Sequence, residues 1–480
     1  MKLADIIETF ISGDWGEESP SNDTPNAVYC VRGADIVPIT NHRFNDIPQR
    51  YVCQRTVDSK MLQAGDLIIE KSGGSPTQST GRIVYVSDDL IREKGNIVCS
   101  NFCTALRVKS EWNPLYVFYY WQNVYNHDAF FNFEGKTSGI KNLQLDNALS
   151  AIEIEYLPLE NQNKIVASLS AIDKKLKINR QINDNLEAMA KQLYDYWFVQ
   201  FDFPDENGKP YKSSGGKMVW NEKLKREIPQ GWDNCVLGDY IGRITNGLNP
   251  RKNFILGNGD NYYVTIRSLV GTTIDWNNCD RCDNEALSKI NSRSQLQVGD
   301  IIFSAIGTIG RTYYILEEPK NWNISETSFT LRAKESVPND FFYGMLLSDE
   351  IQIKADKAAM GSTLRCLVMD SLCSLQYTKI PNNMMISFSA KVASLYRQIH
   401  RNNKEIAELT KQRDDLLPLL MNGQATVNYH LTDNLVFECN HHHYRLYSCY
   451  LNLLFSFVSP TRWIYRTQPD ACGSRGIEWF

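Results

Sequence analysis

Residues 62–69 read LQAGDLII and residues 296–303 read LQVGDIIF, so one short motif occurs twice in this chain, at an offset of 234. A second motif, Leu106–Lys109 (LRVK), recurs as Leu331–Lys334 (LRAK) at an offset of 225. Unrelated strings would not keep the same order with so small a change of offset. We infer an internal duplication, and because its period is far longer than that of a solenoid repeat, each unit is a whole domain with an appendage.

The appendage carries its own repeated pattern. Pro158 and Asn179 match Pro381 and Asn402 at an offset of 223. After each proline, apolar residues recur at alternating three- and four-residue steps, which predicts a long helix with one narrow apolar seam, as in a coiled coil. An extra three-residue step near Asn179 predicts local overwinding of the first helix. The two predicted seams contain Ile165, Leu169, Ile172, Leu176, Asn179, Ile182, Leu186, Met189 and Leu193, and Phe388, Val392, Leu395, Ile399, Asn402, Ile406, Leu409, Leu416 and Leu420.

The two predicted helices are expected to pack against each other. Each has about 35–40 residues, a rod of roughly 55 Å at a rise of 1.5 Å per residue. Alone, such a helix would expose its apolar seam to water. The connection between the helices contains a whole domain and therefore sets no orientation by itself. Two interpretations of Asn179 and Asn402 stay open: they are buried in the seam and fix its register, or they are exposed.

The segments before the helices have a different character. They contain short apolar runs broken by Gly, Asn and Pro, which predicts strands of mixed α/β domains. The segment between the first helix and the second domain is polar and rich in Gly, Lys and Ser, so we expect a linker or surface loop. The predicted order is a first domain at 1–157, a helix at 158–200, a linker at 201–230, a second domain at 231–380, a helix at 381–425, and an anomalous tail at 426–480 outside the fold.

Composition indicates an ordinary soluble protein. The 480 residues are 42% hydrophobic and 22% charged, and the formal net charge is −4. The chain starts without a secretory signal, and it has no apolar stretch of the roughly 18–20 residues that a membrane span needs. The twelve cysteines lack framework spacing, as is typical of a reducing cytoplasm, so we expect a cytoplasmic protein. The net charge does not exclude DNA binding, because phosphate contacts need only a local row of cations.

We considered an enzyme, a DNA methyltransferase or nuclease, as the alternative class. Asn113–Tyr116 (NPLY) faintly resembles the Asn-Pro-Pro-Tyr motif of adenine methyltransferases, but a proline in a first helical turn explains it as well. Pro204–Lys209 has the wrong spacing for a nuclease cluster. Cys279 and Cys282 form a lone CxxC without a second pair, which makes structural zinc improbable. We therefore expect no catalytic site and no metal site.

Several stretches resemble the specificity subunits of type I restriction–modification enzymes. They are Ile172–Asn183 (IDKKLKINRQIN), Leu186–Tyr194 with Trp197 and Phe198, the Ile228–Trp232 stretch (IPQGW) before the second domain, and Arg413–Gly423 (RDDLLPLLMNG) at the end of the second helix. The resemblance covers about residues 1–425. It is specific in the helices and weak inside the domains.

The resemblance implies a fold class and a function. The fold is expected to be α+β, with two mixed α/β target-recognition domains joined by two long helices packed as an antiparallel coiled coil, related by a pseudo-two-fold axis. Each domain would read one half of a split, asymmetric site in double-stranded DNA. The helices would set the spacing and carry two modification subunits, which motor–nuclease restriction subunits then join. This chain would hold no cofactor; S-adenosylmethionine, ATP and Mg²⁺ would be bound by the partners.

Three loops in each half offer the side chains that contact bases and phosphates. The alternative is that these are ordinary solvated turns. The arginines of the LRVK and LRAK motifs recur in both halves, which favours ion pairing or a scaffold role over base reading. The predicted DNA-binding residues are Lys71, Ser72, Ser75, Thr80, Arg82, Lys136, Thr137 and Lys141 in the first half, and Asn246, Asn249, Arg251, Lys252, Arg267, Ser304, Thr308, Arg311, Ser362, Thr363 and Arg365 in the second.

Overall fold

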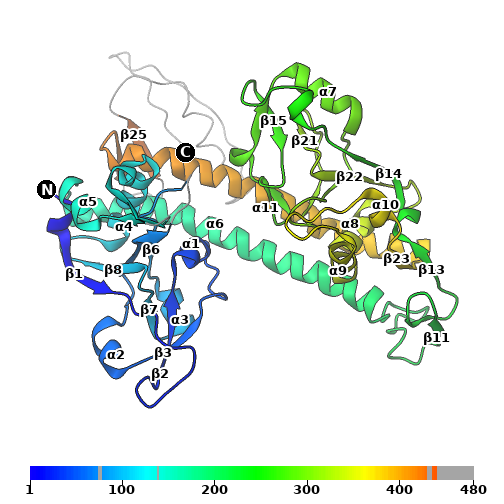
Figure 1. Ribbon diagram of the computed structural model, residues 1–480, viewed down its shortest axis with the longest axis horizontal. Coiled ribbons are helices and arrows are strands. Elements are labelled where there is room, and N and C mark those ends of the chain that lie inside the picture. The colour runs from blue at the N-terminus through cyan, green and yellow to red at the C-terminus, as the bar shows by residue number, and fades with distance from the viewer. Residues whose placement is uncertain (74–77, 138–139, 430–434, 440–480) are drawn as a thin grey trace.

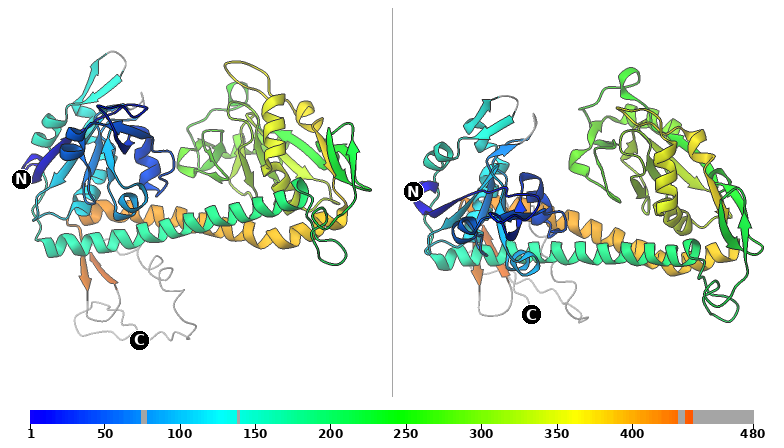
Figure 2. Two further views of the ribbon diagram at one scale, coloured as in Figure 1. Left: turned by 90° about the horizontal axis from the view of Figure 1, so that it is seen from below. Right: turned by 60° about the horizontal axis from the view of Figure 1, so that its bottom comes forward.

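The computed structural model describes residues 1–73, 78–137, 140–429 and 435–439. Two globular heads lie at opposite ends of a pair of long helices, α6 and α11, which run side by side along the longest dimension of the molecule (Figure 1). The first head comprises the elements from η1 (Leu3–Ile6) to α5 (Leu145–Ala151), and the second those from β13 (Asp233–Val236) to β23 (Gln376–Lys379). In the left view of Figure 2 both heads lie above the helix pair, whereas in Figure 1 the first head extends below it and the second above it. No helix in the described part of the chain has the length and apolar character to cross a membrane.

The two long helices are antiparallel. Helix α6 spans Leu159–Tyr194 and continues into a π-helical turn, η4 (Asp195–Val199), and α11 spans Asn382–Met421. Three contacts set the direction: Asp173 lies 3.4 Å from Arg413, Asn179 donates to Glu405, and Asn183 accepts from Asn402. Residue numbers that rise along α6 thus meet numbers that fall along α11. The predicted fold class is confirmed.

The seam of α6 follows a different path from the predicted one in its second half. Ile165, Leu169, Ile172, Leu176 and Asn179 are buried, as are Phe388, Val392, Ile399, Asn402 and Leu409 on α11, while Leu186 and Leu395 are half-buried. The predicted step through Ile182 and Met189 is wrong, since these side chains are 40% and 54% exposed. The seam continues instead through buried Asn183 and Ala190 with half-buried Leu186 and Leu193, so the steps of four and three residues alternate and no overwinding is needed.

Amide side chains occupy the middle of the seam. Asn183 donates to Asn403 at 2.7 Å and accepts from Asn402 at 2.8 Å. Asn179 donates to the Glu405 carboxylate at 2.9 Å, and Lys175 pairs with the same carboxylate. Asn179, Asn183 and Asn402 are buried, with only 5–6% of each residue exposed. Each of them nevertheless has a hydrogen-bond partner on the opposite helix. Sliding one helix past the other would leave them buried without partners, so the cluster favours one register.

The described part of the first head contains two main sheets and one small sheet. The four-stranded antiparallel sheet has the order β1-β8-β4-β6, and the three-stranded sheet has the order β3-β2-β7 with β2 and β7 parallel. A small hairpin of β9 and β10 also pairs with β5. The elements are β1 (Ile7–Ser12), β2 (Asn26–Val31), α1 (Ile36–Thr40), β3 (Gln49–Val52), α2 (Gln54–Lys60), β4 (Leu67–Glu70), β5 (Ser72–Gly73), β6 (Ile83–Tyr85), α3 (Asp88–Lys94), β7 (Ile97–Cys99), β8 (Cys103–Val108), α4 (Pro114–Asn126), β9 (Glu134–Thr137) and β10 (Ile140–Leu143).

The second head repeats both sheets. The four-stranded sheet has the order β14-β22-β19-β20, and the three-stranded sheet has the order β18-β15-β21, again with one parallel pair. Each strand of these two sheets therefore has a counterpart in the first head at the same place. The elements are β14 (Ile241–Asn246), β15 (Asn261–Val264), β18 (Asp280–Cys282), α7 (Asn284–Ser294), β19 (Ile301–Ser304), β20 (Thr312–Tyr314), β21 (Trp322–Ile324), β22 (Ser328–Ala333), α8 (Asn339–Leu347), α9 (Asp349–Ala358) and α10 (Met369–Cys373).

Each head shares its core with both long helices. The first head packs against Ile165 and Leu169 near the start of α6 and against Leu417 and Leu420 near the end of α11. The second head packs against the end of α6 and the start of α11, where Phe388 is completely buried. In each core, the residues of one head thus meet residues of two helices that are distant from each other in the sequence. Because each core requires both helices, a head cannot swing freely on a single connection.

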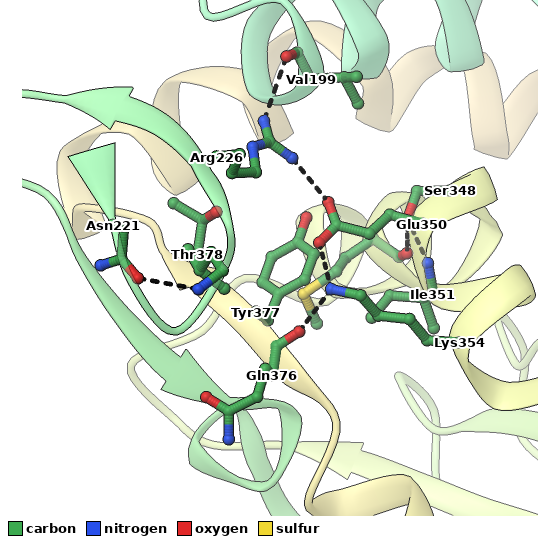
Figure 3. Close-up of polar contacts among 12 residues, drawn as sticks. Val199, Asn221, Arg226, Ser348, Glu350, Ile351, Lys354, Gln376, Tyr377 and Thr378 are labelled. Atoms are coloured by element: carbon green, nitrogen blue, oxygen red, sulfur yellow. Dashed lines mark hydrogen bonds and ion pairs between the residues drawn. The ribbon is translucent and has the colours of Figure 1, made fainter. Parts of the chain in front are cut away.

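The segment predicted as a linker, residues 201–230, is more ordered than its composition indicates. It contains an antiparallel hairpin of β11 (Met218–Asn221) and β12 (Arg226–Pro229), and Phe203 is buried between Tyr211 and Trp232. Figure 3 shows how Arg226 fastens the hairpin, because its guanidinium donates to the Val199 carbonyl and to the Glu350 carboxylate at 3.2 and 3.3 Å. A few aromatic side chains therefore fix a mostly polar segment against the second head.

The seam predicts a sharp contrast between two neighbouring residues of α6. Leu176 is completely buried in a cluster with Ile172 and Leu409, whereas Ile178, two positions later, is 53% exposed. Leu176→Ala is expected to lower the free energy of unfolding by about 2–5 kcal/mol, because it leaves a cavity. The matched Ile178→Ala change should alter it by less than about 0.5 kcal/mol. Chemical denaturation measures both, and equal effects would contradict the packing described.

Candidate nucleic-acid interface

The loop between β4 and β6 in the first head begins and ends in the same way as the loop between β19 and β20 in the second. In the first head, the Glu70 amide donates to the Arg82 carbonyl at 2.9 Å and the Gly81 amide donates back to the Glu70 carbonyl at 3.0 Å. In the second head, Ser304 and Arg311 are joined by the equivalent bond of 2.8 Å, and Gly310 donates to Ser304 at 3.0 Å. Gly81 and Gly310 both have a positive φ, which favours glycine. Arg82 and Arg311 are therefore structural equivalents.

The repeated Gly-Asp and Leu-Arg motifs meet in space. Arg107 donates from two nitrogens to the buried Asp66 carboxylate at 2.8 and 2.9 Å, and Arg332 donates to Asp300 at 2.7 and 2.8 Å. Hydrogen bonding to the Asp66 and Asp300 carboxylates raises the pKa of Arg107 and Arg332. These pairs join β4 to β8 and β19 to β22. The expected ion-pairing role of both arginines is confirmed.

A second loop also has counterparts in both heads. The Leu143 amide donates to the Lys71 carbonyl at 2.7 Å, and the Leu367 amide donates to the Ala305 carbonyl at 2.8 Å. This equivalence places Lys141 and Arg365 at the same position. Each pairs with an acid, Lys141 with Glu134 at 3.1 Å and Arg365 with Asp356 at 3.2 Å. The hairpin of β9 and β10 lies on the side of the first head that faces away from the long helices (Figure 2).

The Glu134 side chain contacts two loops of the first head, one through Thr80 and the other through Lys141. Its Oε1 accepts from the Thr80 amide at 2.7 Å and from the Thr80 hydroxyl at 3.2 Å, while Lys141 pairs with its Oε2. Burial of the carboxyl group opposes ionisation, but the hydrogen bonds from Thr80 and Lys141 outweigh it and lower the pKa of Glu134. A carboxylate at this position therefore joins two loops that are distant in the sequence.

The loop after the first strand of the sheet differs between the heads. In both, a glycine approaches a backbone carbonyl so closely that a Cβ at Gly13 or Gly247 would lie within 2 Å of the Ser100 or Ile324 oxygen. The second-head loop then presents Arg251 and Lys252, both exposed. The first-head loop, residues 13–25, contains four acidic residues and no lysine or arginine. Only the second head can offer cations to phosphates from this loop.

The predicted DNA-binding residues fall into three groups. Several have their polar groups engaged inside the heads: Thr80 and Ser304 are fully buried, and Ser72, Arg82, Lys141, Asn246, Asn249, Arg311 and Arg365 have hydrogen-bond or ion-pair partners within the chain. The accessible group comprises Lys71, Arg251, Lys252, Arg267, Thr308, Ser362 and Thr363. Ser75 lies outside the described residues, as do the side chains of Lys136 and Thr137, whose backbone forms part of β9.

The structure adds a basic residue that the sequence did not single out. Arg293, near the end of α7, donates to the Asn246 side chain from Nε at 3.1 Å and from Nη2 at 2.7 Å. It is exposed and lies next to the loop that carries Arg251 and Lys252. No local motif marks it, because its proximity depends on a contact between segments 47 residues apart.

The features weighed for an enzyme have structural explanations. Asn113 caps α4, where its side-chain oxygen accepts from the Leu115 and Tyr116 amides, and Pro114 occupies the first helical turn. Burial raises the pKa of both Cys279 and Cys282. Within the described ranges, no group of three or more His, Cys, Asp or Glu residues could hold a metal ion. The interpretation of Asn113–Tyr116 as a helix start is confirmed.

The described chain thus consists of two equivalent heads carried on one antiparallel helix pair. Residues 1–188 match the family model for the type I restriction modification DNA specificity domain. The resemblance to type I specificity subunits that the sequence motifs indicated is thus confirmed.

Two curated relatives show how far the similarity extends. The chain is 28% identical over 295 residues to the MjaIX specificity subunit of Methanocaldococcus jannaschii, a match that covers 58% of this chain and 62% of that subunit. It is 22% identical over 470 residues to the HindI specificity subunit of Haemophilus influenzae, covering 84% and 95%. A crystal structure of the type I system S subunit from M. genitalium aligns over 88% of this chain and 95% of that one, at 15% identity and a TM-score of 0.49.

The exposed cations of the second head predict a measurable salt dependence. Arg251→Gln and Lys252→Gln are each expected to reduce the slope of log affinity against log salt by about one, because each removes one phosphate contact. Lys225→Gln, which changes an exposed lysine of the β11–β12 turn, is the matched control and should leave the slope unchanged. Fluorescence anisotropy with duplex DNA at several salt concentrations measures the slopes. Three equal slopes would show that this loop does not meet the backbone.

Proposed function

We propose that this chain reads a bipartite, asymmetric sequence in double-stranded DNA and has no catalytic site of its own. The observation that carries the proposal is the repetition of one strand order in two heads, each anchored in both α6 and α11. Two modules of the same architecture at fixed places on one rod suit a site made of two half-sites with a set gap. One helical turn of DNA, about 34 Å, is within the reach of a rod of this length.

The differences between the heads support an asymmetric site. The loop after β4 extends from residue 71 to 81, whereas its counterpart after β19 extends only from 305 to 310. The loop after β1 is acidic and its counterpart after β14 carries Arg251 and Lys252. Base reading depends on the side chains that loops present to the groove. Heads with one scaffold and different loops would therefore read different half-sites.

The accessible residues are the proposed DNA contacts. Arg251, Lys252 and Arg267 supply exposed cations, of which Arg267 is 74% exposed although Asp280 lies 3.1 Å away. Thr308, Ser362 and Thr363 supply hydroxyl groups in loops of the second head, and Lys71 is half-buried at the base of the first-head loop. Cations of this kind position the duplex, while hydroxyl groups can reach base edges.

The outer face of α6 supports a role as a platform for other subunits. Ile178, Ile182 and Met189 are 53%, 40% and 54% exposed, and their spacing of four and seven residues places them on one side of the helix, away from the seam. We assign this face to a modification subunit, which would bring S-adenosylmethionine; restriction subunits with ATP and Mg²⁺ would join afterwards. The proposed complex contains two modification subunits and is cytoplasmic.

If the helix pair sets the gap between the two half-sites, lengthening both helices should widen that gap. Inserting seven residues into both α6 and α11 on the same side of the polar centre keeps the seam in phase and separates the heads by about 10 Å. The gap between methylated half-sites should then grow by about 3 base pairs. Methylation mapping on random DNA, with the chain co-expressed with its modification subunits, measures the gap. An unchanged gap, or a continuous motif, would refute the proposal that the helix pair sets the gap.

The proposed platform is tested by one charged side chain. Met189→Glu should weaken assembly with the modification subunit at least tenfold, because it would bury a carboxylate in an apolar contact. Gln181→Glu adds the same charge at an exposed position outside the apolar stripe and should leave assembly intact. Co-purification and titration by analytical ultracentrifugation measure both. Assembly that resists Met189→Glu would place the partner elsewhere.

A further inference from the structure

One buried carboxylate in the first head is met by three separate segments of the chain. The Glu70 side chain is 3% exposed and accepts from the Arg82 guanidinium, from Nε at 2.8 Å and from Nη2 at 2.5 Å. A Cβ at Gly33 or at Gly73 would lie 2.6 Å from the Glu70 Oε1. The carboxylate therefore lies between the turn after β2, the strand β5 and the end of the β4–β6 loop. These are segments from which the proposed reading loops of the first head arise.

In the second head, a serine hydroxyl and backbone carbonyls take the place of the Glu70 carboxylate. The position of Glu70 is taken by Ser304, whose buried hydroxyl donates to the Thr308 carbonyl at 2.6 Å and accepts from the Arg311 amide at 2.8 Å. The Arg311 guanidinium instead donates directly to the Ile266 and Leu269 carbonyls at 3.0 and 2.6 Å. Those carbonyls belong to the turn after β15, the counterpart of the turn after β2. In the second head the arginine thus bonds directly to this turn, whereas in the first head the carboxylate that Arg82 holds lies against the equivalent turn.

A second ion pair on the same strand has a different distribution. Asp66 and Arg107, at the other end of β4, recur in the second head as Asp300 and Arg332 with nearly identical bonds. The pair that recurs belongs to the common scaffold. The Glu70–Arg82 pair does not recur, and it lies at the end of the sheet from which the variable loops emerge. This distribution separates a scaffold pair from a pair particular to one head.

We propose that Arg82 and Arg311 are positioning residues that fix the reading loops of the two heads, Arg82 through Glu70 and Arg311 through backbone carbonyls. This proposal rests on the proposed DNA-reading function and replaces direct DNA contact as the role of these two arginines. Their donors are engaged inside the protein, and Arg82 is only 17% exposed. A guanidinium in a two-bond fork with a buried carboxylate holds its neighbours in one geometry, which lysine cannot reproduce.

The test uses Glu70→Gln and Arg82→Gln in the full chain, co-expressed with its modification subunits. Both variants are expected to lower discrimination against a mismatched first half-site by about tenfold, while discrimination at the second half-site is unchanged. Arg311→Gln should give the reverse pattern, and Arg82→Lys should fall between wild type and Arg82→Gln. Asp66→Asn is the matched control: it should lower the thermal midpoint, yet below that midpoint it should leave both discriminations intact.

The two roles of Arg82 predict opposite results for Glu70→Gln. If Arg82 contacted a phosphate, neutralising Glu70 would not weaken reading, and Arg82→Gln would reduce the salt slope by about one. That outcome would overturn the proposal.

Hydrogen exchange without DNA gives an independent readout. Exchange should rise in residues 32–36 and 70–73 for Glu70→Gln and in 265–270 for Arg311→Gln, with the other head unchanged. Unchanged exchange in these segments would overturn the positioning role, whereas a wild-type complex without split-site preference would overturn only the proposed function.

Discussion

The burial of the α6 seam against the α11 seam is the contact on which the rest of the structure depends. Full burial of a leucine or isoleucine contributes about 1.5–3 kcal/mol, and the two helices contribute such side chains on both sides of the central amide cluster. At each end, the same helices supply part of a head's core: Phe388 in one and Leu169 in the other. A loss of pairing would therefore expose the seam and also open both cores. The amides at the centre, led by Asn183 and Asn402, add direction to an attraction that by itself has none.

The molecule combines a symmetric scaffold with asymmetric loops. The Asp66–Arg107 and Asp300–Arg332 pairs show how similar the two scaffolds are, since their hydrogen bonds are 2.8 and 2.9 Å in one head and 2.7 and 2.8 Å in the other. The two heads differ beyond the ends of their strands. Glu70 of the first head corresponds to Ser304 of the second, and the acidic loop of the first head corresponds to the loop that carries Arg251 and Lys252. This division suits a protein whose heads must stay equivalent toward the rod and differ toward their targets. It also means that accessible cations are unevenly distributed between the heads.

The sequence predicted the duplication and the two helices because both are properties of periodic, local pattern. The first half of the seam was correct for that reason. The prediction failed after Asn179, where the pattern offered Ile182 and Met189 as seam residues; the structure buries Asn183 instead, because its amide has partners on α11 that no local pattern reveals. Apolar residues of a long helix can belong to the seam or to an outer, exposed face. Only the path of the partner helix shows which of these two faces a given residue lies on.

The candidate site was less predictable than the fold. Gly, Ser and basic residues marked loops that lie at equivalent places in the two heads, but Arg82 and Arg311 have partners that depend on tertiary contacts, and so has Arg293 beside Asn246. The order within residues 201–230 was likewise hidden, since it depends on a few aromatic side chains in a polar segment. In each case the missing information is which distant residue lies next to a polar group. Sequence spacing carries none of it.

The central claim is that the helix pair holds the two heads at one separation. Pulsed electron paramagnetic resonance tests it directly, with spin labels on non-canonical residues at exposed positions, Ser59 in α2 of the first head and Ser292 in α7 of the second. A single narrow distance distribution, the same with and without DNA, is the predicted result. A broad distribution, or two populations in the free protein, would show that the heads move independently and would contradict the account.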